Sequence, residues 1–116
     1  MIRVERIYKA ADDESGWRVL VDRLWPRGVS KNAAKLDDWM KEIAPSEALR
    51  KWFGHKPGRW AEFQKRYRAE LTKKSELIGK LRKAEKEHGT ITLLFGAKDE
   101  ERNQAVVLRA VLKRTR

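Results

Sequence analysis

The chain has no cysteine, only three prolines among its 116 residues, and no long uninterrupted apolar run. Without cysteine it cannot form a disulfide bond, a thiolate metal site or a cysteine nucleophile. Charged side chains at Arg3, Glu5 and Arg6 interrupt the amino-terminal segment, which excludes the apolar core of a signal peptide. No later stretch has the length of a membrane span. We therefore expect a cytoplasmic protein that does not enter a membrane.

Histidine is scarce as well. His55 lies in a predicted loop, and His88 stands at a predicted helix end, where the helix dipole favours a basic group. The two are not spaced like metal ligands, so the sequence predicts no metal site and no cofactor. Of the two histidines, only His55 is a candidate general base, since an isolated loop histidine can exchange a proton near neutral pH.

Acidic residues are outnumbered by 17 to 28, which gives a net charge of +11. Residues 50–87 carry much of the excess, with 13 Lys or Arg against five Glu. A solvated helix face and a nucleic-acid-binding face both account for this stretch, and charge alone favours the solvated face. If nucleic acid is the partner, it is expected to bind the basic helical face of residues 59–86 through Lys65, Arg66, Lys73 and Lys74.

The apolar periodicity alternates between strand and helix and predicts one domain over residues 1–116. The fold class is α/β, a compact three-layer domain with a small, mostly parallel sheet flanked by helices. Residues 36–43 fit either a helix or a strand, and Pro45 favours an extended ending. The expected strands cover residues 2–8, 17–25 and 90–95, with a short one in 36–43, and the expected helices cover 31–35, 46–54, 59–73, 75–88 and a last one capped by Asp99.

The most informative segment is Val19–Gly28, in which a buried strand runs into Asp22, Arg23 and Arg27. Ligands of open α/β sheets bind beyond the carboxyl ends of the strands, and paired guanidinium groups hold phosphates or carboxylates there. This pattern predicts an anion site at the strand end. Asp22 has a structural alternative, because a carboxylate beside two arginines can serve only to orient them.

The last strand ends at a second polar group, formed by Lys98, Asp99, Arg102, Asn103 and Gln104. If this strand lies beside the second one, both groups converge on one cleft. The amino terminus of the last helix would add unpaired N–H groups that favour an anion. Asp99 repels an anion, however, and capping the helix is an equally good explanation for it.

Several motifs together resemble a known family. They are Asp22–Gly28, Ala44–Ser46, Leu49–His55, Arg59-Trp60, Glu62-Phe63, Arg66-Tyr67 and Leu93–Glu101. The chain is identified by them as a member of the short, YeaO-like branch of the family catalogued as domain of unknown function 488. The resemblance covers nearly the whole chain and implies no particular reaction.

The chain departs from the family patterns at the last strand end. Longer relatives have Cys-x-Glu followed by Cys-His-Arg, and the resemblance aligns these with five positions that lack all of those residues, namely Phe95, Ala97, Asn103, Gln104 and Ala105. Cys-His chemistry therefore does not transfer. The short branch has His before Asn, where this chain has Arg102. That substitution removes a proton-transfer candidate and adds a cation to the predicted anion site.

The leading hypothesis is a domain that binds a phosphorylated or otherwise anionic small molecule, nucleotides included. The expected ligand contacts are Arg23, Trp25, Arg27, Lys98, Arg102 and Asn103. If the protein is an enzyme, Asp22, His55 or Asp99 would act as acid or base. The alternatives are the nucleic-acid-binding face described above and a domain that serves only as a partner for another protein.

Overall fold

The computed structural model describes residues 1–114. The strands are β1 (Ile2–Arg6), β2 (Trp17–Leu20), β3 (Asp38–Trp39) and β4 (Ile91–Phe95). The α-helices are α1 (Lys31–Ala34), α2 (Glu47–Phe53), α3 (Trp60–Leu71), α4 (Ser75–His88) and α5 (Gln104–Arg114). Two 3₁₀ turns, η1 (Lys41–Ile43) and η2 (Pro57–Arg59), precede α2 and α3 respectively.

The four strands form a parallel sheet in the order β1-β4-β2-β3. All five residues of β4 are buried, because this strand has a neighbour on each side and packing on both faces. The parallel α/β architecture predicted from the sequence is confirmed. The order also places β2 directly beside β4, so their carboxyl ends meet at one edge.

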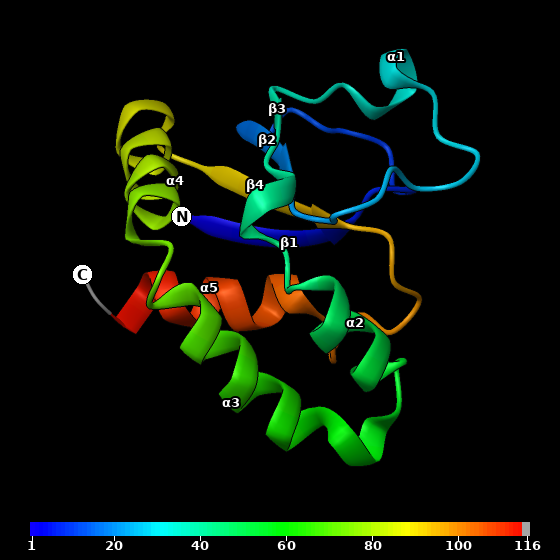
Figure 1. The fold of residues 1–116 in the computed structure, drawn as a ribbon. Coiled ribbons are helices and arrows are strands. Elements are labelled where there is room, and N and C mark those ends of the chain that lie inside the picture. The colour runs from blue at the N-terminus through cyan, green and yellow to red at the C-terminus, as the bar shows by residue number, and fades with distance from the viewer. Residues whose placement is uncertain (115–116) are drawn as a thin grey trace.

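The two faces of the sheet are covered unequally (Figure 1). Helices α2, α3, α4 and α5 pack on one face and form the main core, to which β4 contributes Ile91, Leu93 and Phe95. On the other face, α1 and its flanking coil cover Leu20 and Leu94 in a smaller cluster. The third layer is therefore one short helix and coil.

Several element boundaries differ from the sequence-based expectation. The second strand ends at Leu20 rather than Trp25, and one more backbone bond, from Val21 N to Leu94 O at 3.0 Å, joins it to β4. Beyond this point the chain turns away over the sheet edge. Residues 36–43 contain the short strand β3 and the 3₁₀ turn η1 rather than a continuous helix. The extended conformation that Pro45 imposes is confined to the residue before it, Ala44, at ψ 159°.

The expected start of the last helix at Asp99 is wrong. Helix α5 begins at Gln104, and Asn103 precedes it as the cap, with its Oδ1 accepting a hydrogen bond from Val106 N at 3.2 Å. Asp99 instead accepts from the backbone N–H groups of Glu101 and Arg102 and closes a turn. Two capping residues lie four positions apart, and the chain uses the first for the turn and the second for the helix.

Candidate functional site

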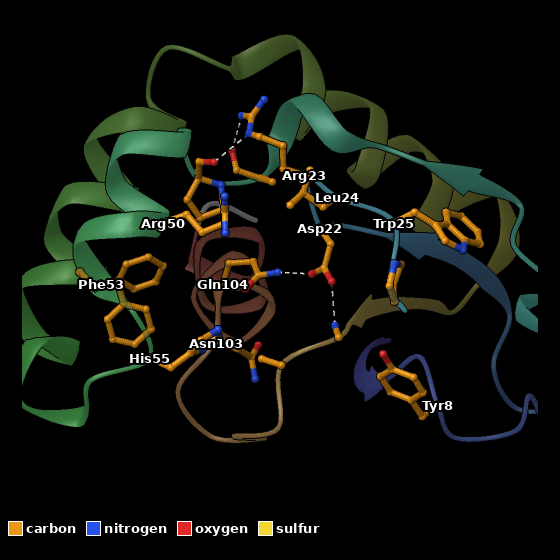
Figure 2. A pocket seen from close by; sticks show the side chains of 16 residues that line it. Tyr8, Asp22, Arg23, Leu24, Trp25, Arg50, Phe53, His55, Asn103 and Gln104 are labelled. Carbon is orange, nitrogen blue, oxygen red and sulfur yellow. Dashed lines mark hydrogen bonds between the residues drawn. The ribbon is translucent and has the colours of Figure 1, made fainter. Parts of the chain in front are cut away.

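A cavity of about 270 Å³ lies beyond the carboxyl ends of β2 and β4, and we call it the strand-end pocket (Figure 2). The loops after these strands form one side, and α2 with the segment that follows it forms the other. Its polar lining consists of Tyr8, Asp22, Arg23, Arg50, His55, Asn103 and Gln104. The rest of the lining consists of Leu24, Trp25, Pro26, Ala44, Pro45, Phe53, Phe63, Gly96 and Ala97.

Asp22 joins the ends of the two neighbouring strands. One carboxylate oxygen accepts from Gly96 N at 2.8 Å, and the other accepts from Nε2 of Gln104. Burial raises the pKa of this carboxyl to about 6, and the two hydrogen bonds oppose the rise. No salt bridge within residues 1–114 involves Asp22, so its negative charge is compensated by dipoles alone.

The glycine at position 96 makes this arrangement possible. A Cβ added at Gly96 would lie 2.9 Å from Oδ2 of Asp22, which is too close for the present hydrogen bond. The backbone can approach the carboxylate this closely only because residue 96 has no side chain. This explains physically why a glycine follows β4.

Helix α2 supplies the opposite wall. Ser46 caps the helix by accepting from Leu49 N, and Gly54 ends it in the left-handed region at φ 52°. His55 follows with φ 56°, a conformation that is costly for a residue with a side chain. The ring of His55 lies 5.9 Å from that of Phe53. Figure 2 shows both rings and Arg50 entering from the α2 side.

The direction of α2 is set by residues 43–46, which we call the connector. The buried Tyr67 hydroxyl donates to the carbonyl of residue 43 at 2.7 Å, and Arg23 donates to those of residues 44 and 45 at 3.2 and 3.1 Å. Lys74 also donates to the carbonyl of residue 44, at 3.0 Å. Glu70 accepts from the backbone N–H and hydroxyl of residue 46. Side chains from the loop after β2, from α3 and from the turn after α3 thus clamp the connector.

Arg23 has a structural role in addition to the predicted one of a ligand contact. Its guanidinium lines the pocket, but its Nε and one terminal nitrogen are directed at the connector carbonyls. Arg50, which the sequence analysis did not single out, is exposed at the pocket wall. No hydrogen bond or salt bridge among residues 1–114 uses its guanidinium.

Trp25 and Tyr8 line the remaining edge. The indole N–H of Trp25 donates to Val29 O at 2.7 Å, and its ring packs edge-on against Trp39 at 5.2 Å. The Tyr8 hydroxyl donates to the carbonyl of Arg27 at 3.0 Å. These contacts fix the loop after β2, so the pocket edge is a defined surface.

The structure brings together five of the predicted site residues, because all of them line the pocket. They are Asp22, Arg23, Trp25, His55 and Asn103. Arg27, Lys98, Asp99 and Arg102 do not line it. Arg27 and Lys98 are exposed, and Arg102 pairs with Asp99 at 3.3 Å within its own turn. The sequence predicted that the charged residues after both strands converge on one cleft. Four of them do not, because the turns that carry them direct their side chains away from the cavity.

Sequence reasoning missed Tyr8, Arg50, Phe53 and Phe63 as lining residues. Phe53 and Phe63 also belong to the core stripes of their helices, which conceals a second role. Arg50 lies one turn before Gly54 on a short helix, and only the orientation of that helix shows where its side chain points. The expectation that ligands bind beyond the carboxyl ends of strands identifies only residues that follow strands. It does not identify residues of a helix that forms the opposite wall of the pocket.

The four residues of the predicted nucleic-acid-binding face are used unequally. Lys65 and Lys73 are exposed, whereas Arg66 pairs with Glu62 at 2.9 Å and lies over the Trp52 ring at 4.1 Å. Lys74 is partly buried on the connector. Half of the set is thus committed to contacts within the protein, which weakens the case for a phosphate-binding face.

Residues 1–114 contain no helix long and apolar enough to cross a membrane. In the same part of the chain, no group of three or more His, Asp or Glu side chains is placed to hold a metal ion.

Sequence similarity identifies the family to which this chain belongs. A family model described as "Inactive DUF488-N3 subclade" matches residues 1–116. The chain belongs to the DUF488 family. It is 42% identical over 107 residues to "Uncharacterized protein YeaO" of Escherichia coli (strain K12), which is 92% of each chain. The YeaO-like resemblance inferred from the motifs is thereby confirmed.

A second relative is "Uncharacterized protein Rv3073c" of Mycobacterium tuberculosis (strain ATCC 25618 / H37Rv). It is 39% identical over 111 residues, which cover 96% of this chain and 92% of the relative. No solved structure matches the chain.

Proposed function

We propose that the strand-end pocket binds a small organic anion, such as a phosphate ester, a nucleotide or a carboxylate. The observation that carries this proposal is the uncommitted Arg50 guanidinium on a preformed cavity whose other lining is largely apolar. His55 lies on the same wall, and the side-chain amides of Asn103 and Gln104 line the cavity beside the start of α5. A guanidinium among apolar walls is an efficient partner for phosphate or carboxylate.

The size of the cavity favours a compact ligand. At about 270 Å³ it lies just below the range of roughly 300–1,000 Å³ that is typical of small-molecule sites. A short phosphate ester or a single ring with one anionic group fits this volume better than a dinucleotide does. A mononucleotide would leave part of its length outside the cavity.

The site supports binding better than catalysis. Of the three predicted acid–base candidates, Asp99 lies outside the lining, and Asp22 is engaged by two donors that connect the strand ends. The matching family model is described as inactive. We therefore propose a binding role in which Asp22 and His55 contact the ligand without transferring a proton to it.

A thermal-shift experiment with matched variants tests the proposal. Inorganic phosphate, simple phosphate esters, mononucleotides and a short DNA duplex are added to the wild-type protein, Arg50→Gln and Arg27→Gln. A ligand present at 100 times its Kd stabilises the native state by about 2.7 kcal/mol, so it should raise the midpoint by about 10 °C. We expect small anions to shift the wild type and Arg27→Gln, and to shift Arg50→Gln much less.

Arg27→Gln is the matched control because it removes an exposed arginine outside the cavity lining. Equal shifts in both variants would exclude Arg50 as the anion contact. A shift with the duplex alone would transfer the function to the basic face of α3 and α4.

A further inference from the structure

We propose that Asp22 selects, among small organic anions, those whose buried end carries an ammonium group or another nitrogen with N–H groups to donate. This inference rests on the proposed anion-binding function and adds the chemistry of the opposite end of the ligand. It assigns Asp22 a specificity role instead of a purely structural one.

The Asp22 carboxylate has hydrogen-bonding capacity that the described part of the chain does not use. An ionised carboxylate is an acceptor with about four lone-pair positions. Gly96 N occupies one position on one oxygen, and Gln104 Nε2 occupies one on the other. Each oxygen can therefore accept a further donor, and Asp22 is part of the cavity lining (Figure 2).

Among the described residues, the negative charge of Asp22 lacks a counter-ion. Removing a charge from water is costly unless the charge is paired, and dipoles alone compensate less than a counter-ion does. Within residues 1–114 the salt bridges leave Asp22 without a cation, whereas the buried carboxylate of Glu5 pairs with Arg3 at 2.5 Å. A ligand ammonium at Asp22 would supply the missing partner.

The cavity has side chains of opposite charge on its two sides. Figure 2 shows Asp22 on the side of the strand ends, with Arg50 and His55 on the α2 side. A ligand with one anionic end is therefore oriented with that end toward α2 and its other end toward Asp22. An apolar end at this position would leave the Asp22 charge unpaired, and a carboxylate end would be repelled by it. The site therefore discriminates against ligands that cannot donate a hydrogen bond to Asp22.

NMR titrations with three probes that differ by one group each test this inference. Phosphoethanolamine carries both a phosphate and an ammonium, ethyl phosphate lacks the ammonium, and ethanolamine lacks the phosphate. Because a hydrogen-bonded charge is worth more than a neutral contact, we expect the wild type to bind phosphoethanolamine at least about tenfold more tightly than ethyl phosphate. In Asp22→Asn this preference should fall to about twofold or less, with binding of ethyl phosphate retained or strengthened.

The outcomes separate the two proposals. Equal affinities of the wild type for phosphoethanolamine and ethyl phosphate would overturn the role of Asp22 and leave the anion-binding function intact. A preference that survives in Asp22→Asn would also overturn it. If ethanolamine binds as tightly as phosphoethanolamine, the result would support selection of ammonium groups by Asp22 and contradict the proposed contact between the anion and Arg50. Failure of all three probes to bind would overturn the role of Asp22, whereas the thermal shifts with mononucleotides would still decide the anion-binding function. The wild-type titrations with phosphoethanolamine and ethyl phosphate decide the role of Asp22 even if the variant does not fold.

Discussion

Replacing Asp22 with asparagine should make the protein more stable at neutral pH, although the change removes a hydrogen-bonded side chain. Asparagine has nearly the same shape. Its Oδ1 can accept from Gly96 N, and its Nδ2 can donate to the amide oxygen of Gln104 once that amide rotates by half a turn. The substitution therefore keeps two hydrogen bonds and removes a buried charge that no salt bridge neutralises within residues 1–114.

The magnitude follows from the pKa. Burial raises the pKa of Asp22 from the ordinary 3.8 to about 6, and each pKa unit corresponds to about 1.4 kcal/mol. Ionised Asp22 thus costs the native state at most about 3 kcal/mol. Between about pH 4 and pH 6 the native state holds a proton that the unfolded state has released, so the stability contributed by Asp22 falls as pH rises through this window.

Urea unfolding of the wild type and Asp22→Asn at several pH values measures the effect. The difference in free energy of unfolding between the two proteins should be small near pH 4 and should grow in favour of the variant to at most about 3 kcal/mol by about pH 8. A difference that does not change with pH would refute the reasoning. So would a variant that becomes less stable than the wild type as pH rises.

Asp99→Asn is the matched control with the opposite sign. Hydrogen bonds from the backbone of Glu101 and Arg102 lower the pKa of Asp99, so its ionised form stabilises the native state. That stability is present above the ordinary pKa of an aspartate and is lost as pH falls through the lower native pKa. Asp99→Asn should therefore lose stability relative to the wild type at neutral pH, where Asp22→Asn gains it.

Three further substitutions test the scaffold of the site by urea unfolding. Tyr67→Phe leaves the carbonyl of Ile43 without its buried donor and should cost about 1–3 kcal/mol, and an unchanged midpoint would show that this clamp contributes nothing. Asn103→Ala removes the cap of α5 and should cost about 1 kcal/mol, whereas no loss would mean that another group caps the helix. Arg23→Ala removes donors from two connector carbonyls and should cost about 1–2 kcal/mol, while Arg27→Ala should cost less than about 0.5 kcal/mol; equal costs would contradict the connector role of Arg23.

The fold was predictable where a local pattern decides the structure. The continuous apolar run of β4 marks a strand that is buried on both faces, and the stripe along α3 marks its packed side. From these patterns follow the parallel sheet and the position of Asp22 at its carboxyl edge. The register of β2 against β4, which brings Gly96 to Asp22, needs the assembled sheet.

The arginines show why the site was only partly predictable. Arg23 was assigned to an anion because a guanidinium after a strand has that role in many folds. Its partners here are carbonyl groups more than 20 residues further along the chain, and nothing local to Arg23 indicates them. Arg50 was overlooked for the converse reason: its pattern is that of a solvated helix, and only the orientation of α2 brings it to the cavity.

The connector links these observations. Three of its carbonyl groups are engaged by side chains of Arg23, Tyr67 and Lys74, and Glu70 engages its last residue. Such a segment has little freedom to move, so α2 is held at one angle and its side of the pocket is formed before any ligand arrives. Arg23 and Tyr67 would then influence ligand affinity as positioning residues, through the orientation of α2. Weaker binding in Tyr67→Phe, whose altered atom lies outside the cavity lining, would be the signature of that indirect effect.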